Sequence, residues 1–259
     1  MAGLNTGGQR PAGDDGTADP RLAAVLARYA AGQESERAML TALAGTRLLV
    51  PLVERPAGQA GEHAADGDHG TDGCDHQLTR EMAFPMLIGR DGRPALLAFT
   101  SLAALAGWQP QARPVPTPAG QVWGSAVDSQ CAVVIDVAGP VPLAVDGTRL
   151  AALAAGEPVP APPDDPDIQA DVAAALAGLP GLAGAELTAG PDGTDLGVRL
   201  LIHPVAPGAD RPATVQTTVQ ATVQQAAEAI AARLAGRLRR GIEFSAVMAP
   251  TAAQPRSAT

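Results

Sequence analysis

The chain has 259 residues and a formal net charge of −9, and all 18 of its basic residues are arginine. Because a protein needs a basic surface to neutralise nucleic-acid phosphates, this charge argues against nucleic-acid binding and against binding to anionic membranes. No apolar run approaches the ~20 residues of a membrane span. The first twenty residues lack the apolar core of a secretory signal and carry acidic residues, so we expect a cytoplasmic protein.

Hydrophobic residues make up 46% of the chain, but aromatic residues only 2%, so alanine, leucine and valine must build the core. The two cysteines, Cys74 and Cys131, are too few for a disulfide framework. The length fits one large domain or two small ones.

The first ordered element is predicted to be a helix that begins at Asp19-Pro20, because Asp is a good N-cap and Pro suits the first helical position. Its apolar residues recur at helical spacing, and Gly32 ends it. A second helix over 35–44 and a buried strand over 47–53 follow. Residues 1–18 are expected to form a disordered tail.

The next part of the chain mixes strands and helices. Two strands, 84–89 and 94–99, are joined by a hairpin turn at Asp91-Gly92. A short helix then leads to Pro110 and Pro114, which favour an irregular exit. The remaining expected elements of this domain are a helix over 117–128, strands over 131–137 and 141–145, and a helical segment over 148–155. This order lacks strict β-α-β alternation and predicts an α+β domain over 19–155, with a mixed sheet and flanking helices.

Residues 156–167, GEPVPAPPDDPD, have the composition of a stiff, extended linker and mark the best candidate domain boundary. A smaller domain over 168–248 is predicted to have the order α-β-β-α-β. Its strands at 183–187 and 195–202 form a hairpin, and its long helix spans about 213–240. Residues 249–259 are expected to form a flexible tail.

One cluster of residues could bind a metal ion. It consists of His63, His69, Cys74 and His76, with four aspartates between them. The spacing matches no closed zinc site, and ordering a glycine-rich loop would cost ~1–2 kcal/mol per residue. We therefore expect a solvated loop and no bound metal or other cofactor, and a metal-buffering loop remains the alternative.

Catalytic motifs are missing. The chain contains no GxxxxGK[ST] loop, no GxGxxG after a strand and no GxSxG turn. Ser125, His203 and Cys131 are the possible nucleophiles or bases, and each is better explained as a structural residue. No acid–base pair can be assigned, so the sequence leans away from an enzyme.

Arginines suggest two possible binding surfaces. Arg233, Arg237, Arg239 and Arg240 could bind an anion, but cations at a helix C-terminus also stabilise the helix dipole, and we favour that role. Trp and Arg are common interface anchors, so the second candidate surface is made of Arg90, Arg93, Trp108 and Arg113. The alternative is that Trp108 packs on the core.

The segment from Arg47 to Leu153 resembles the N-terminal domain of the SseB family, the enhanced serine sensitivity proteins, in the form common in high-GC (actinobacterial) bacteria. The resemblance rests on four stretches: LLVPLV, EMAFPMLIGRDGRPALLAFTSLAALAGW, QARPVP and AVVIDVAGPVPLAVDG. It implies an α+β fold. It implies no established enzymatic activity and supplies no catalytic residues to transfer.

We therefore expect a two-domain α+β protein that works by binding another protein, through its first domain near Trp108 and Arg113. The alternative is a sensor or enzyme of a small metabolite, with a pocket at the domain junction. The sequence leaves the oligomeric state open.

Overall fold

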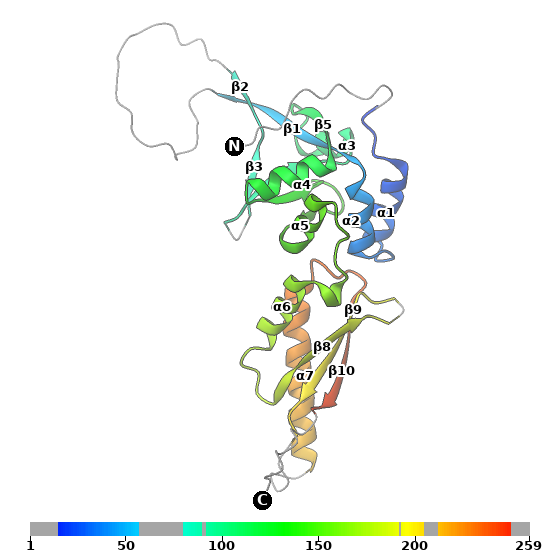
Figure 1. Ribbon diagram of the computed structural model, residues 1–259, viewed down its shortest axis with the longest axis vertical. Helices are drawn as coiled ribbons and strands as arrows, with labels where there is room; N and C mark the ends of the chain where they lie inside the picture. Colours follow the sequence, from blue (N-terminus) through cyan, green and yellow to red (C-terminus); the bar gives the residue numbers. More distant parts are fainter. Residues whose placement is uncertain (1–14, 57–79, 90–91, 192, 205–211, 250–259) are drawn as a thin grey trace, which may run out of the picture. The chain divides into compact units, whose positions relative to one another are not determined.

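The computed structural model describes residues 15–56, 80–89, 92–191, 193–204 and 212–249 (Figure 1). Its residues group into two compact units. Unit 1 consists of residues 1–22 and 43–157, and unit 2 consists of residues 23–42 and 158–259. The chain therefore passes from one unit to the other three times, after residues 22, 42 and 157.

Two helices open the described chain, α1 (Pro20–Ala30) and α2 (Glu36–Ala44). The carboxylate of Asp19 accepts hydrogen bonds from the backbone N–H groups of Arg21 and Leu22, which confirms the predicted N-cap. Residues 15–18 do not belong to a free tail as expected, because the Gly16 carbonyl accepts a hydrogen bond from the Leu102 N–H. Residues 1–14 lie outside the described chain.

Unit 1 contains two β-sheets (Figure 1). The first has the order β2-β1-β5 and is antiparallel, and the second has the order β3-β4-β6-β7, in which β4 and β6 are parallel. Two backbone hydrogen bonds between Leu49 and Phe99, of 2.7 and 2.9 Å, join the sheets. The strands are β1 (Arg47–Pro56), β2 (Arg80–Ala83), β3 (Met86–Ile88), β4 (Pro94–Ala98), β5 (Arg113–Pro118), β6 (Ala132–Ile135) and β7 (Leu143–Val145).

The prolines of residues 113–118 predicted an irregular segment, but these residues form strand β5. It pairs with β1 along its whole length. Neighbouring residues of a strand direct their N–H groups to opposite sides, so Pro114, Pro116 and Pro118 all lack the N–H on the side that faces away from β1. The residues between the prolines keep the N–H groups that bond to β1. Because β5 is an edge strand, the alternate prolines cost no hydrogen bond within the sheet.

The helices of unit 1 cover its sheets. They are α3 (Leu102–Trp108), α4 (Ala119–Asp128) and α5 (Gly147–Ala155). Helix α4 buries Val122, Trp123 and Ala126, and α5 buries Leu150 and Leu153, and in each helix these residues are spaced so that they share one face. An apolar cluster beneath α3 is formed by Leu49, Leu97, Phe99 and Leu105.

Unit 2 contains the predicted α-β-β-α-β arrangement. Its three-stranded sheet has the order β10-β9-β8, with β8 antiparallel and β10 parallel to β9. One face of the sheet packs on α6 and α7 through Leu196, Val198 and Leu200. The elements are α6 (Pro166–Leu176), β8 (Leu182–Ala189), β9 (Leu196–Ile202), α7 (Pro212–Leu234) and β10 (Ile242–Met248). Helix α7 ends at Leu234 rather than near residue 240.

The proline-rich segment packs within unit 2 instead of extending freely as its composition suggested. Residues Pro162–Asp164 form a short 3-10 helix, η1, and Asp165 caps α6 by accepting a hydrogen bond from the Asp167 N–H. The Val159 carbonyl accepts a hydrogen bond from the Arg37 side chain at 2.8 Å. Where the domain boundary lies along the sequence stays a prediction.

The mixed α+β class predicted from the sequence is confirmed. No helix among the described residues has the length and apolar character needed to cross a bilayer.

Candidate functional site

Trp108 lies at the end of α3 and packs on the apolar cluster beneath that helix. Its ring centroid is 5.6 Å from that of Phe99, with the two planes tilted by 31°. Phe99 is fully buried and Trp108 is half-buried. The geometry is that of a favourable aromatic pair, and it gives Trp108 a packing role in unit 1.

Arg113 lies on the surface at the start of β5. Its side chain is 71% exposed and forms a 3.6 Å ion pair with Glu54. An exposed pair of this kind contributes little to stability, so the guanidinium can exchange partners at low cost.

Arg93 lies apart from Trp108, although both belong to one short stretch of sequence. Arg93 precedes β4 and Phe99 follows it, so the five residues of β4 separate them, which places them about 20 Å apart at ~3.3 Å for each step along the strand. The structure therefore separates Arg93 from Trp108, and a binding role for Trp108 and Arg113 stays a prediction. Arg90 lies outside the described residues.

A small pocket of about 190 Å³ opens beside Arg93. The pocket lies between the end of α4 and the starts of β6 and α5. The start of α5 reaches this place because β7, which precedes it, pairs with β6. The lining of the pocket includes Arg93, Val127, Gln130, Cys131, Asp146 and Leu150.

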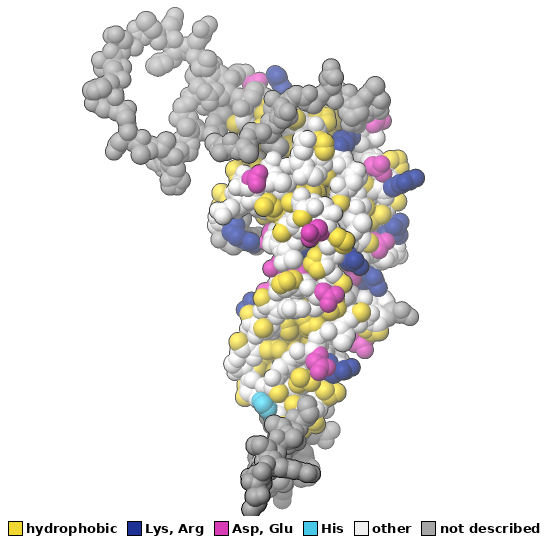
Figure 2. All heavy atoms as spheres, viewed as in Figure 1, with side chains coloured by type: hydrophobic (Ala, Val, Ile, Leu, Met, Phe, Trp, Pro, Cys, Tyr) yellow, Lys and Arg dark blue, Asp and Glu magenta, His cyan; other side chains and the backbone are white. Residues whose placement is uncertain are grey.

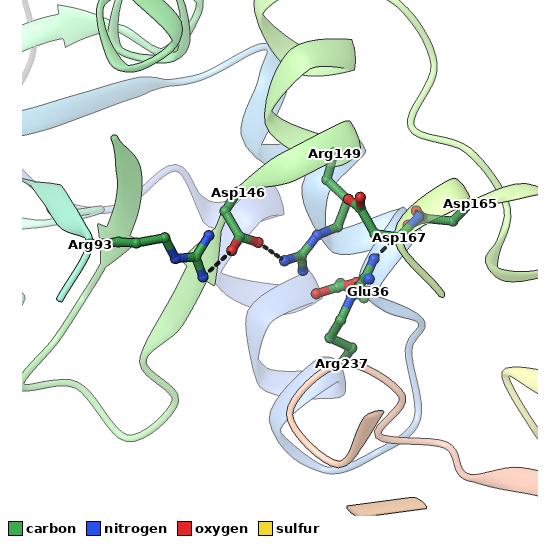
Figure 3. A network of polar contacts seen from close by, with 7 residues as sticks. All are labelled: Glu36, Arg93, Asp146, Arg149, Asp165, Asp167 and Arg237. Atoms are coloured by element: carbon green, nitrogen blue, oxygen red, sulfur yellow. Dashed lines mark hydrogen bonds and ion pairs between the residues drawn. The ribbon is translucent and has the colours of Figure 1, made fainter. Parts of the chain in front are cut away.

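Asp146 is the charged centre of this pocket. It accepts a hydrogen bond from Arg149 at 2.6 Å and forms a 3.0 Å ion pair with Arg93, and the two arginines approach it from opposite sides (Figure 3). Burial raises the pKa of Asp146, but the charges and hydrogen bonds of Arg149 and Arg93 outweigh burial and hold that pKa below its ordinary value. The carboxylate is therefore ionised at neutral pH and attracts the exposed guanidinium of Arg93 to the rim of the pocket.

Three aliphatic side chains on the elements next to Arg93 contact solvent. Ile88 is 70% exposed, Met86 is 46% exposed and Val127 is 43% exposed. Ile88 lies opposite Pro94 in the β3–β4 pair, next to Arg93, and Val127 lines the pocket together with Arg93. Met86, Ile88, Arg93 and Val127 thus define one surface of unit 1, which we call the β3 surface.

The α4 C-terminus shapes the floor of the pocket. The N–H of Cys131 bonds to the Ala126 carbonyl and the N–H of Gln130 bonds to the Val127 carbonyl, which is a Schellman motif. Gln130 occupies the left-handed position of this motif, with φ of 52°, where glycine is usual. A side chain is thus held at the pocket at some cost in backbone energy.

The side chains that the sequence offered as possible nucleophiles or bases lie in positions that suit a structural role. Cys131 is buried, and burial raises the pKa of its thiol despite backbone hydrogen bonds, so the reactive thiolate is disfavoured. Ser125 lies within α4 and is half-buried. His203 is exposed just after β9.

The candidate metal ligands His63, His69, Cys74 and His76 lie outside the described residues. Within the described ranges, no group of three or more His, Cys, Asp or Glu side chains could hold a metal ion. The metal-binding alternative therefore remains a prediction from sequence.

The arginine cluster of unit 2 is engaged within that unit. Arg237 forms ion pairs with Asp165 and Glu36, Arg239 lies over the ring of Tyr29 at 5.1 Å, and Arg240 donates its backbone N–H to Asp195. Arg233 pairs with Asp171 at 3.7 Å, and it alone of the four lies within α7. On the face shown in Figure 2, the described arginines lie among carboxylates and form no continuous basic area. The interpretation as cations that balance the helix dipole holds only for Arg233.

A polar pair that the sequence did not predict lies at the C-terminal ends of β4 and β6, with Thr100 buried and Asp136 half-buried. Asp136 accepts hydrogen bonds from the Thr100 N–H at 2.8 Å and from the Thr100 hydroxyl at 2.6 Å. Burial raises the pKa of Asp136, and the two hydrogen bonds from Thr100 reduce that effect without cancelling it. Asp136 also has a φ of 48°, which Asp tolerates better than most residues. The contact depends on the parallel pairing of β4 with β6, and no sequence motif indicates it.

Unit 1 is therefore an α+β domain whose most accessible candidate site is an aliphatic surface beside a small charged pocket. The family model for the SseB protein N-terminal domain matches residues 22–152. This match covers half of the chain, and the protein belongs to the SseB family. No curated protein and no solved structure matches the chain.

Proposed function

We propose that this SseB-family protein is a non-catalytic interaction module that binds another protein through the β3 surface of unit 1. The observation that carries the proposal is the exposure of Met86, Ile88 and Val127 on elements that lie next to Arg93 and its ion pair with Asp146. Exposed aliphatic groups that gather on one surface indicate a contact site more often than scattered ones do.

The geometry of the pocket supports binding of a protein more than binding of a metabolite. At about 190 Å³, the pocket is smaller than the ~300–1,000 Å³ typical of small-molecule sites. It can accept one side chain from a partner, while the surrounding aliphatic groups bury apolar area. Arg93 and Asp146 would then form part of the polar rim that protein interfaces commonly have.

A matched pair of substitutions in the full-length chain tests this proposal. Val127→Ser removes apolar area from the β3 surface, and Val247→Ser changes a valine of nearly equal exposure in unit 2, 41% against 43%. In quantitative pull-downs, partners that bind the β3 surface should be reduced at least about fivefold by Val127→Ser and by Ile88→Ser. Val247→Ser should leave their recovery unchanged.

Two results would contradict the proposal. One is an identical set of partners for the wild type, Val127→Ser and Ile88→Ser proteins, all shown to be folded by circular dichroism. The other is a thermal shift with a small metabolite that Val127→Ser abolishes, because that result would assign the pocket to a metabolite instead. A ligand present at ~100 times its Kd stabilises a protein by about 2.7 kcal/mol, which such a screen detects readily.

A further inference from the structure

The outer edge of β8, in unit 2, is open. Within the described chain β8 pairs only with β9, so the backbone groups on its other side have no strand partner. Its sequence, LAGAELTA, contains no proline and no basic residue, and its single charge, Glu186, is paired with Arg199 of the same sheet at 3.1 Å. Edge strands are usually blocked by prolines, lysines or inward-facing charges. Strand β5 of unit 1 is blocked by its prolines, whereas β8 is not.

A groove of about 580 Å³ runs beside this open edge, between β8 and α6. Its floor is apolar and includes Val172, Leu176, Leu182 and Leu187. Its helical wall carries the short side chains of Ala173 and Ala177, together with Gln169, at intervals of four residues. None of its lining residues carries a charge. An open strand edge next to an apolar groove is the arrangement that receives an added β-strand in several kinds of peptide-binding domain.

A second copy of this chain is a poor occupant. In a symmetric dimer built on the β8 edge, the strand beside each groove would be β8 of the other copy, LAGAELTA. The alanines and the glycine of this strand are too short to fill the groove. The groove instead needs side chains larger than its own, carried on an extended segment.

The carboxylate of Asp164 favours a positive charge at one end of the bound segment. Asp164 is exposed beside Pro163, which lines the groove. A cationic residue at the corresponding end of a bound strand would be attracted to Asp164, whereas an acidic one would be repelled.

We propose that the β8–α6 groove of unit 2 binds an extended segment of a partner protein by strand addition to β8. The segment carries aliphatic side chains at alternate positions, which enter the groove, and an arginine or lysine at the end next to Asp164. The register shift of β8 between Leu182 and Gly184 leaves the stretch from Gly184 to Ala189 for regular pairing. This site is independent of the β3 surface, and each can exist without the other.

Selection of peptides on the full-length chain tests this proposal. The probe is a phage-displayed library of random peptides of 8 residues, the length of β8. Enriched peptides should alternate aliphatic residues and carry Arg or Lys at one end. Hydrogen exchange of the β8 amides should slow when such a peptide binds, because the outer backbone groups become paired.

A matched pair of variants locates the binding site. Ala173→Arg places a bulky cation in the groove and should weaken peptide binding at least about tenfold. Ala174→Arg changes the next exposed alanine of the same helix, which does not line the groove, and should change affinity less than about twofold. Asp164→Asn should weaken peptides with a basic end about two- to fivefold and leave uncharged ones unaffected.

Three results would overturn the proposal. The first is a library with no enriched peptide, and the second is equal affinity for the Ala173→Arg and Ala174→Arg proteins. The third is a dimer, seen by light scattering, that Ala173→Arg dissociates, because the occupant would then be a second copy of the chain.

Discussion

Thr100 donates two hydrogen bonds to Asp136, one from its backbone and one from its hydroxyl, and so ties together the C-terminal ends of two parallel strands. Thr100 is buried, and its carbonyl oxygen also accepts a hydrogen bond from Arg47 of β1 at 3.1 Å. The pair therefore connects β4 and β6 of one sheet with β1 of the other.

Replacing Asp136 should destabilise the protein in a graded way. Asp136→Ala leaves the two buried donors of Thr100 without their acceptor and should lower the free energy of unfolding by about 1–3 kcal/mol. Asp136→Asn keeps one acceptor oxygen and tolerates the positive φ, so it should cost less. Urea denaturation of the three proteins measures the order, and equal losses for both variants would contradict it.

The stability contributed by Asp136 should also depend on pH. Burial raises the pKa of this carboxyl above its ordinary value of 3.8, so the folded state binds the proton more tightly than the unfolded state does. The resulting stabilisation is fully present below pH 3.8 and is lost as the pH rises through the raised folded pKa. The difference in unfolding free energy between wild type and Asp136→Asn, measured from about pH 3 to about pH 7, should move in favour of the variant. A flat difference would contradict this prediction.

Trp108 should matter for stability more than for binding at the β3 surface. Trp108→Ala removes a half-buried ring from Phe99 and should cost about 2–3 kcal/mol, at or below the low end for truncated aromatic residues. Trp108→Phe keeps a ring in place and should cost less. Thermal unfolding measures both costs. A Trp108→Ala protein that stays stable but no longer binds its partners would contradict this prediction and assign Trp108 a role in binding.

Gln130→Gly should stabilise the protein. The left-handed conformation costs a residue with a side chain roughly 1–2 kcal/mol, and glycine removes most of that strain while gaining some entropy in the unfolded chain. The expected net gain is up to about 1 kcal/mol in urea denaturation. Gln121→Gly, an exposed position inside α4, is the control and should instead cost about 1 kcal/mol.

The alternate prolines of β5 predict opposite outcomes for neighbouring positions. Val115→Pro removes an N–H that faces β1 and should cost about 3 kcal/mol or more. Pro116→Val restores an N–H on the outer edge, so it should leave stability nearly unchanged and increase self-association, because the edge becomes able to pair. Denaturation and light scattering separate the two effects. A severe loss of stability in Pro116→Val would contradict the orientation inferred for the prolines.

Replacing each of two aspartates of unit 2 by alanine should lower the free energy of unfolding by very different amounts, although both aspartates pair with arginine. Asp165→Ala removes the N-cap of α6 and the closer of the two buried carboxylates that pair with Arg237, at a cost of about 3 kcal/mol. Asp171→Ala breaks an exposed pair with Arg233 and should cost less than about 1 kcal/mol. High salt should reduce the second effect and leave most of the first.

Local patterns predicted most of the elements, because they depend on neighbouring residues. The Asp19 cap, the hairpin of β3 and β4, and the β8–β9 pair follow from capping, turn and alternation rules. Strand β5 was missed because three prolines count against a strand unless all three face the same free edge. That condition depends on the strand order, which local patterns do not contain.

The candidate site was predictable only in part. Arg93 was selected for its residue type, but its separation from Trp108 depends on the extended conformation of β4. Exposure of Met86 and Ile88 could have been inferred from their alternation around Leu87, once β3 was known to be an edge strand. Val127 joins them through tertiary structure alone.

The order in which the chain visits its two units restricts how the protein can be truncated. A fragment that began at residue 158 would lack residues 23–42, which belong to the same unit. Arg237 would lose Glu36, Arg239 would lose the ring of Tyr29, and the Val159 carbonyl would lose Arg37. Cutting at the proline-rich segment therefore cannot release two intact halves, and deletion or gene-fusion studies must keep the amino-terminal helices together with the carboxy-terminal half.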